Sequence, residues 1–144
     1  MKIEALGHVV IKVSDQQRAE AFYHGVLGIP IAARNVQPPM TFFSLGNHHD
    51  FAILALGETA QKAPHNAVGL YHVAFKIGDD ISALKEAKAQ LEAAGITCSA
   101  VDHDVTKSLY FTDPDNNMVE VYVDASDAWK QEPQRVAHGA PLAI

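Results

Sequence analysis

Two segments of the chain repeat one pattern, ALGHVVIKVSD at residues 5–15 and GLYHVAFKIGD at residues 69–79. In each copy a histidine is followed by valine, two apolar residues, lysine and a β-branched residue. A short run of this composition is typical of a strand that packs one face on a core. The repeat therefore predicts a chain made of two copies of one small unit, in which His8 and His72 hold equivalent positions.

The first copy, module one, spans residues 3–56 and reads as β-α-β-β-β. Ser14 and Gln17 form an S-x-x-Q capping box at the start of its helix. Gly28 fits the left-handed residue that follows the helix. Strands are expected at residues 3–13, 29–35, 40–45 and 49–56.

The second copy, module two, spans residues 70–124 and follows a linker, residues 57–69, that carries Gly, Pro and Asn without periodicity. A helix is expected at residues 80–94, and strands at residues 70–77, 96–101, 107–112 and 117–123. The order is again β-α-β-β-β. We therefore predict an α+β fold in which residues 1–124 form one domain, followed by a C-terminal tail at residues 125–144.

Composition narrows the class of protein. The 144 residues are 48% hydrophobic and 19% charged, as in soluble globular proteins. The net charge of −6 and the scattered Lys and Arg argue against nucleic acid as a partner, because phosphate binding needs a clustered basic surface. We expect no membrane span and no signal peptide, since no apolar run is long enough and the N-terminus enters a strand pattern at once. A single cysteine, Cys98, suits a reducing compartment, so we expect a cytoplasmic protein.

Strand parity places three potential metal ligands on one class of face. Alternate residues of a strand point to opposite sides of a sheet. The apolar residues expected to face the helices are Val9, Ile11, Val13, Val73, Phe75, Ile77, Val119, Val121 and Val123. His8, His72 and Glu120 then fall on the opposite, more polar faces. A lone histidine on a strand is usually structural or exposed, but two at equivalent repeat positions together with a carboxylate predict a metal site.

Alignment of the two final strands sets Glu120 opposite Ala52, which offers no ligand atom. Three protein ligands leave open positions on an octahedral ion. Two histidines and one carboxylate with open positions are the pattern of non-haem Fe(II) oxygenases, so Fe(II) is the predicted metal. Mn(II), Zn(II) and Ni(II) accept the same ligand types.

These paired modules, with His8, His72 and Glu120, resemble the vicinal oxygen chelate superfamily, which includes glyoxalases, extradiol dioxygenases, fosfomycin-modifying enzymes and bleomycin-binding proteins. The segment DPDNNMVEVYV (113–123) is similar to the DPDGN-x-x-E ending of that superfamily, with Asn116 where glycine is usual. Asparagine tolerates a positive φ. The resemblance covers about residues 3–124 and implies a cupped, mostly antiparallel sheet of eight strands with helices outside, and a homodimer.

Two further segments resemble type I extradiol ring-cleaving dioxygenases. HHDFAILAL (48–56) is similar to their strand that carries a catalytic histidine, and HDVTKSLYFTDP (103–114) to their segment with a supporting histidine and an active-site tyrosine. By that resemblance His49 would transfer a proton, Tyr110 would contact the substrate and His103 would stand behind Tyr110. Strict alternation favours His48 over His49 unless the strand bulges at its start. Without the resemblance, the histidine pair reads as a polar turn and Tyr110 as a core aromatic residue.

The resemblance implies an Fe(II)-dependent extradiol dioxygenase that cleaves a catechol-like aromatic diol with O₂. Alternatives in the same superfamily are a glyoxalase-type lyase or isomerase and an antibiotic-modifying thiol transferase, although no basic cluster supports an anionic substrate. From a different functional class, the alternative is a metal-free module that sequesters a planar ligand, as bleomycin-resistance proteins do.

Overall fold

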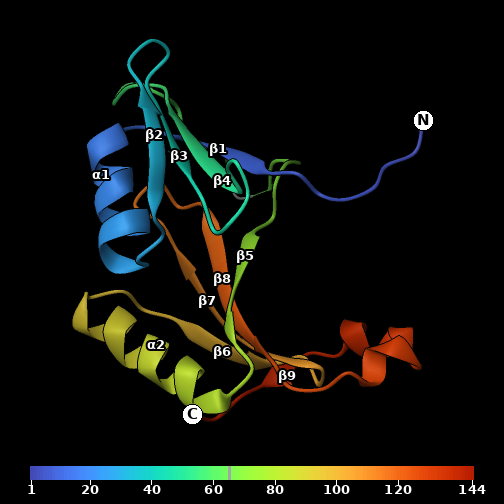
Figure 1. The fold of residues 1–144 in the computed structure, drawn as a ribbon. Coiled ribbons are helices and arrows are strands. Elements are labelled where there is room, and N and C mark those ends of the chain that lie inside the picture. Colours follow the sequence, from blue (N-terminus) through green and yellow to red (C-terminus); the bar gives the residue numbers. More distant parts are fainter. Residues whose placement is uncertain (65) are drawn as a thin grey trace. The chain divides into compact units, whose positions relative to one another are not determined.

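Figure 1 shows a computed structural model of the chain, which describes residues 1–64 and 66–144. His65, in the predicted linker, lies outside the described residues. The chain divides into two compact units, Met1–Ala67 (unit 1) and Val68–Ile144 (unit 2). Each unit contains one β-α-β-β-β module, so the predicted α+β class is confirmed.

Unit 1 forms a four-stranded sheet in the order β1-β4-β3-β2, in which β1 runs parallel to β4 and the other neighbours are antiparallel. The core of the unit joins its helical segment to this sheet. The ring of Tyr23 lies 4.7 Å from that of Phe51, Phe43 and Phe51 are 5.6 Å apart, and all three side chains are fully buried. The elements are β1 (Val9–Val13), α1 (Gln16–Glu20), the π-helical segment η1 (Ala21–Val26), β2 (Ile31–Asn35), β3 (Met40–Phe43) and β4 (Phe51–Ala55).

The start of α1 corrects the predicted capping box. Asp15, not Ser14, is the N-cap, and its carboxylate accepts a hydrogen bond from the backbone N–H of Arg18 at 2.6 Å. The Ser14 hydroxyl instead accepts a hydrogen bond from the Arg18 guanidinium. A charged carboxylate is a good cap because it also meets the positive end of the helix dipole. Gly28 has φ 73°, as predicted for the residue after the helix.

Unit 2 forms a five-stranded sheet in the order β5-β8-β7-β6-β9, with β5 parallel to β8. The helix α2 packs on β5, β7 and β8 (Figure 1). Its side chains Leu84 and Leu91 are buried. The eight predicted strands are present among the described residues, and the short strand β9 is an addition that the sequence did not predict. The elements are β5 (Val73–Gly78), α2 (Ile81–Ala93), β6 (Ser99–Asp102), β7 (Thr106–Thr112), β8 (Met118–Asp124), the 3-10 helices η2 (Ala128–Lys130) and η3 (Pro133–Ala137), and β9 (Ala140–Pro141).

The predicted apolar faces hold for β8 but not for all of β5. Alternate valines of β8 are buried, as expected. Ile77 was expected on the buried face of β5, yet 37% of its surface is exposed. The pairing of β5 with β8 shifts register between Lys76 and Gly78, and a bulge of this kind interrupts the alternation of side chains.

Among residues 1–64 and 66–144, no helix combines the length and apolar character needed to cross a lipid bilayer.

The Asp15 cap can be tested by mutation. Asp15→Ala should lower the free energy of unfolding by about 1 kcal/mol, because the N–H of Arg18 loses its acceptor. The measurement is urea unfolding followed by circular dichroism. Ser14→Ala is the matched control and should cost less than half as much; a larger effect for Ser14→Ala than for Asp15→Ala would contradict this assignment of the cap.

Candidate functional site

Equivalent residues of the two modules occupy equivalent register positions. In unit 1 Val10 pairs with Ala52, and in unit 2 Ala74 pairs with Glu120. The sheets therefore agree with the alignment that set Glu120 opposite Ala52. His8 and His72 stand two residues before Val10 and Ala74, directly before β1 and β5.

The antiparallel neighbours extend this equivalence. Phe42 of β3 pairs with Ala52, and Tyr110 of β7 pairs with Glu120. At this register position the sheet of module one carries a phenyl ring and a methyl group, whereas the sheet of module two carries a phenol and a carboxylate. The polar chemistry of the duplicated position is therefore confined to module two.

The Glu120 carboxylate is held inside unit 2 by two neighbours. It is 7% exposed, accepts a hydrogen bond from the buried Ser108 hydroxyl at 2.5 Å, and its second oxygen lies 3.0 Å from Nε2 of His72. Burying a carboxylate is costly unless partners replace its water. Ser108 was missed by the sequence reasoning, although it shares a face of β7 with Tyr110 and strand parity could have found it.

The His72 and Glu120 pair fits a metal ion on its donor chemistry. An imidazole nitrogen and a carboxylate oxygen at 3.0 Å need a proton or a cation between them. The other ring nitrogen of His72, Nδ1, is buried and has no hydrogen-bond partner among the described residues. In the metal-free protein the contact with Glu120 therefore places a proton on Nε2 of His72, and a cation can replace that proton without breaking a hydrogen bond at Nδ1.

The turn before β8 presents Glu120 at the correct register. One oxygen of the Asp113 side chain accepts hydrogen bonds from the backbone N–H groups of Asp115 and Asn117, both at 2.8 Å. Asn116 adopts φ 67°, which agrees with the expectation that asparagine replaces the usual glycine of this motif.

Tyr110 and His103 form a hydrogen-bonded pair in unit 2. The phenol oxygen lies 2.9 Å from Nε2 of His103, and the ring stands edge-on to that of His72 with centroids 5.5 Å apart. Burial, followed by the nearby negative charge of Glu120, raises the pKa of Tyr110 to about 12. The phenol is therefore a hydrogen-bond donor at neutral pH.

Three imidazoles gather in unit 1. Ligand atoms of His8, His48 and His49 all lie within 4.8 Å of one another, and the rings of His8 and His49 are 4.2 Å apart. Loss of hydration lowers the pKa of His49, and the neighbouring charges of His8 and His48 lower it further. His48 and His49 lie in the loop before β4, so the alternation of a strand does not choose between them. Asn47 accepts a hydrogen bond from Nδ1 of His48 at 2.9 Å, which leaves Nε2 of that ring as its ligand atom.

The predicted site residues are therefore divided between the units. Unit 2 brings His72 to Glu120 and His103 to Tyr110, and unit 1 brings His8 to His49. The meeting of His8 with the pair in unit 2 stays a prediction.

Five of the six lysines and arginines among the described residues of unit 2 form ion pairs with carboxylates. These pairs are Lys76 with Asp79 and Asp124, Lys88 with Glu92, Lys107 with Asp102, Lys130 with Asp127, and Arg135 with Asp104 and Glu132. Neutralised cations of this kind do not favour an anionic substrate, in agreement with the scattered basic residues of the sequence.

Comparisons with known proteins give one consistent family. Residues 5–121 match the profile described as the Glyoxalase/Bleomycin resistance protein/Dioxygenase superfamily. Biphenyl-2,3-diol 1,2-dioxygenase 3 of Rhodococcus globerulus is 34% identical over 141 residues, which cover 93% of this chain and 70% of that protein. Glutathione transferase FosA of Serratia marcescens is 30% identical over 123 residues, which cover 84% and 82%. The crystal structure of lactoylglutathione lyase from Agrobacterium tumefaciens superposes with a TM-score of 0.64 at 26% identity, covering 85% of this chain and 96% of that one.

A double-mutant cycle on the metal-free protein tests the contact between Ser108 and Glu120. Ser108→Ala, Glu120→Ala and the double variant should give a coupling free energy of about 1.5–3 kcal/mol, the range for a hydrogen bond to a charged group. Urea unfolding measures it. The pair Ser99→Ala and Glu120→Ala is the control, since Ser99 is exposed on β6. A coupling energy near zero for the Ser108 cycle would show that the carboxylate is not held as described.

Proposed function

The chain belongs to the glyoxalase/bleomycin resistance protein/dioxygenase superfamily, and from this premise we propose that it is a metal-dependent extradiol dioxygenase that cleaves a catechol-like diol with O₂. The observation that carries the proposal is the hydrogen bond between His103 and Tyr110, with the ring of Tyr110 edge-on to His72 and its strand position opposite Glu120. This pair supplies a phenol and an imidazole base beside two of the proposed ligands, His72 and Glu120. The similarity to a biphenyl-diol dioxygenase over 93% of the chain supports the same reaction.

The ligands we propose are His8, His72 and Glu120, and their donor set favours Fe(II). When bound, the ion would supply a Lewis-acidic centre with open positions for the two oxygens of the diol and for O₂. Glu120 carries the negative charge of the site, and Ser108 fixes the direction of its free lone pairs through the 2.5 Å hydrogen bond.

Three further residues handle protons. Tyr110 hydrogen-bonds a substrate hydroxyl, and His103, at 2.9 Å, accepts the phenol proton and so orients the ring. His49 is the proton donor during ring opening. Its pKa is lowered, so its protonated ring is a stronger proton donor than an ordinary imidazolium.

A second candidate function is a thiol transferase, which the similarity to glutathione transferase FosA over 82% of that protein favours. The ion-paired lysines and Arg135 of unit 2 argue against an anionic substrate. A glyoxalase-type lyase is less favoured, because Ala52 stands where a fourth ligand would be needed. A metal-free sequestering module remains as the outcome if no divalent metal binds.

Metal binding distinguishes the proposed ligands from the histidine cluster of unit 1. Anaerobic titration of the purified chain with Fe(II) should load about one ion per chain, and His8→Ala, His72→Ala and Glu120→Ala should each weaken binding by roughly 100-fold or more. His48→Ala is the matched control from the cluster and His24→Ala the control for an exposed histidine, and both should retain the metal. Loss of metal in His48→Ala, with retention in His72→Ala and Glu120→Ala, would assign the ion to the cluster instead.

Turnover tests the reaction. The Fe(II)-loaded protein should consume O₂ and develop ring-fission absorbance with at least one member of a catechol panel. His49→Ala and Tyr110→Phe should each lower kcat by roughly 10²–10⁴-fold, the range for a lost acid or base, while His24→Ala should not change it.

Two outcomes would contradict these assignments. Full turnover by His49→Ala would remove its role as proton donor. An iron-loaded protein that is inactive on the whole panel, but adds glutathione to an electrophile, would replace the dioxygenase with the transferase.

A further inference from the structure

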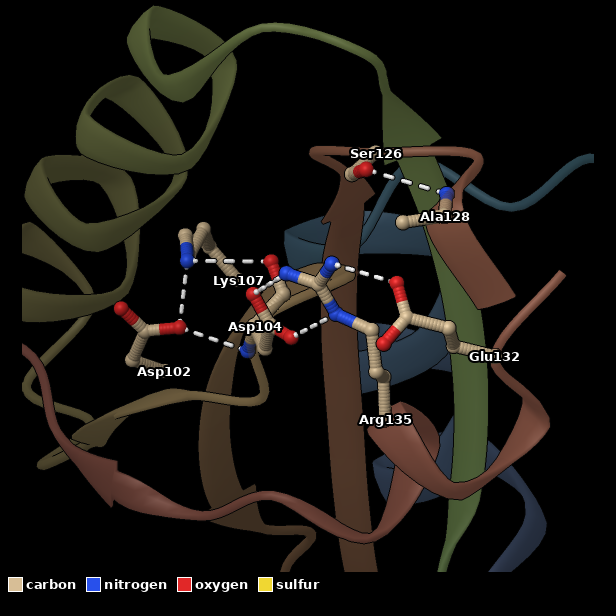
Figure 2. Close-up of polar contacts among 7 residues, drawn as sticks. All are labelled: Asp102, Asp104, Lys107, Ser126, Ala128, Glu132 and Arg135. Atoms are coloured by element: carbon tan, nitrogen blue, oxygen red, sulfur yellow. Dashed lines mark hydrogen bonds and ion pairs between the residues drawn. The ribbon is translucent and has the colours of Figure 1, made fainter. Parts of the chain in front are cut away.

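The C-terminal tail packs on the edge of the unit 2 sheet. Its strand β9 pairs antiparallel with β6, so that Pro141 stands opposite Val101, and the backbone N–H of Leu142 donates to the carbonyl of Ala100 at 3.1 Å. The tail turns away from β8 at Ser126, whose hydroxyl accepts a hydrogen bond from Ala128 N–H at 3.1 Å (Figure 2). These contacts bring the segment around residue 138 back to the start of β7.

A two-point ion pair fastens this segment to the β6–β7 turn. Nε and Nη2 of Arg135 lie 2.5 Å and 2.9 Å from the two oxygens of Asp104 (Figure 2). Asp104 adopts φ 64°, and its backbone N–H donates to Asp102 at 2.7 Å while its carbonyl accepts from Lys107 at 3.2 Å. Bidentate Arg–carboxylate pairs fix orientation as well as distance. The turn that carries His103 is therefore tied to the tail by its next residue, Asp104.

The tail also reaches the ring of His103 directly. Nδ1 of His103 lies 2.6 Å from the backbone carbonyl oxygen of His138. A carbonyl oxygen only accepts hydrogen bonds, so Nδ1 must carry the proton. In the neutral ring Nε2 is then an acceptor, and it faces the Tyr110 hydroxyl at 2.9 Å. With a neutral His103 ring, the hydrogen bonds that link His138, His103 and Tyr110 therefore run in one direction. Nδ1–H donates to the His138 carbonyl, and the Tyr110 phenol donates to Nε2.

We propose that the C-terminal segment 132–144 is a positioning element, in which the Arg135–Asp104 ion pair holds the His138 carbonyl against His103 and so fixes the tautomer that receives the hydrogen bond of Tyr110. Its effect on turnover rests on the proposed function, whereas the tautomer is a property of the protein itself. In the opposite tautomer Nε2–H would point at the phenol oxygen. Tyr110 would then accept from His103, and its own proton would be directed elsewhere.

The matched variants are Arg135→Ala, Arg135→Lys and Lys130→Ala. Arg135→Ala removes both contacts to Asp104, and Arg135→Lys keeps the charge but not the two-point geometry. Lys130→Ala is the control, because it removes a tail cation that pairs with the exposed Asp127. Thermal unfolding of all three verifies that the fold is retained.

The decisive measurement is the ¹⁵N NMR spectrum of the histidine rings in the metal-free, full-length chain at a pH of about 8, where an ordinary imidazole is neutral. The His103 signals are assigned by their loss in His103→Asn. We expect the wild type to show His103 as the Nδ1–H tautomer alone. Arg135→Ala should give a mixture of tautomers, Arg135→Lys an intermediate mixture and Lys130→Ala the wild-type spectrum.

The same spectra contain the results that would overturn the inference. A wild-type His103 with its proton on Nε2 would contradict it directly, even if Arg135→Ala failed to fold. An unchanged tautomer in a folded Arg135→Ala would show that the ion pair does not set the ring.

Steady-state kinetics separate this inference from the proposed function. Arg135→Ala should lower kcat with a catechol by about 10-fold to 100-fold and change KM by less than about twofold, since the tail orients a proton-handling pair and does not bind substrate. Inactivity of the wild type on every catechol would overturn the proposed function alone, because the tautomer experiment does not depend on turnover. An equal loss in Lys130→Ala would overturn the specific role of Arg135.

Discussion

The candidate site depends on the contacts that hold the buried Glu120 carboxylate. A charged group that is only 7% exposed needs partners in place of water, and the structure supplies the Ser108 hydroxyl and the His72 imidazole. Ser108 and Tyr110 point to one side of β7 because they are two residues apart, and β7 pairs with β8 so that Tyr110 stands opposite Glu120. The antiparallel register of two neighbouring strands therefore assembles the acid, its hydrogen-bond donor and the phenol.

The two modules share the same strand pairing, and the residues at equivalent positions differ in their chemistry. In each module the first strand pairs in parallel with the last, and this pairing gives Ala52 and Glu120 equivalent register positions in their own sheets. In module one this register position holds the apolar pair Phe42 and Ala52, which cannot coordinate an ion or transfer a proton. The repeated position therefore carries a single carboxylate, Glu120, as the proposed three-ligand site requires.

Much of the fold could be predicted from the sequence because the strands are short, alternating and separated by clear breakers. The errors arose where one local interaction overrode the pattern. Asp15 caps the first helix although Ser14 and Gln17 match a capping box, since a carboxylate one residue later is the charged acceptor. Ile77 is exposed because a bulge in β5 shifts its register. His48 and His49 precede β4, so a parity argument built on a longer strand could not separate them.

The sequence predicted the parts of the candidate site that are made by side chains and not those made by the backbone. Histidine, glutamate and tyrosine at repeat-equivalent or family-like positions were recognisable, and the pairs His72 with Glu120 and His103 with Tyr110 do lie together. The contact from the tail to His103 was not foreseen, because it is made by a backbone carbonyl that any residue at position 138 would supply. Strand β9 is only two residues long and includes Pro141, so it leaves no periodic signal.

The most direct test of the central claim is an anaerobic crystal structure of the Fe(II)-loaded protein, with anomalous scattering to locate the iron. The account predicts one iron bound by His8, His72 and the Glu120 carboxylate, with Ser108 still hydrogen-bonded to the second carboxylate oxygen. Iron bound by His8, His48 and His49, with Glu120 directed away from it, would contradict the account.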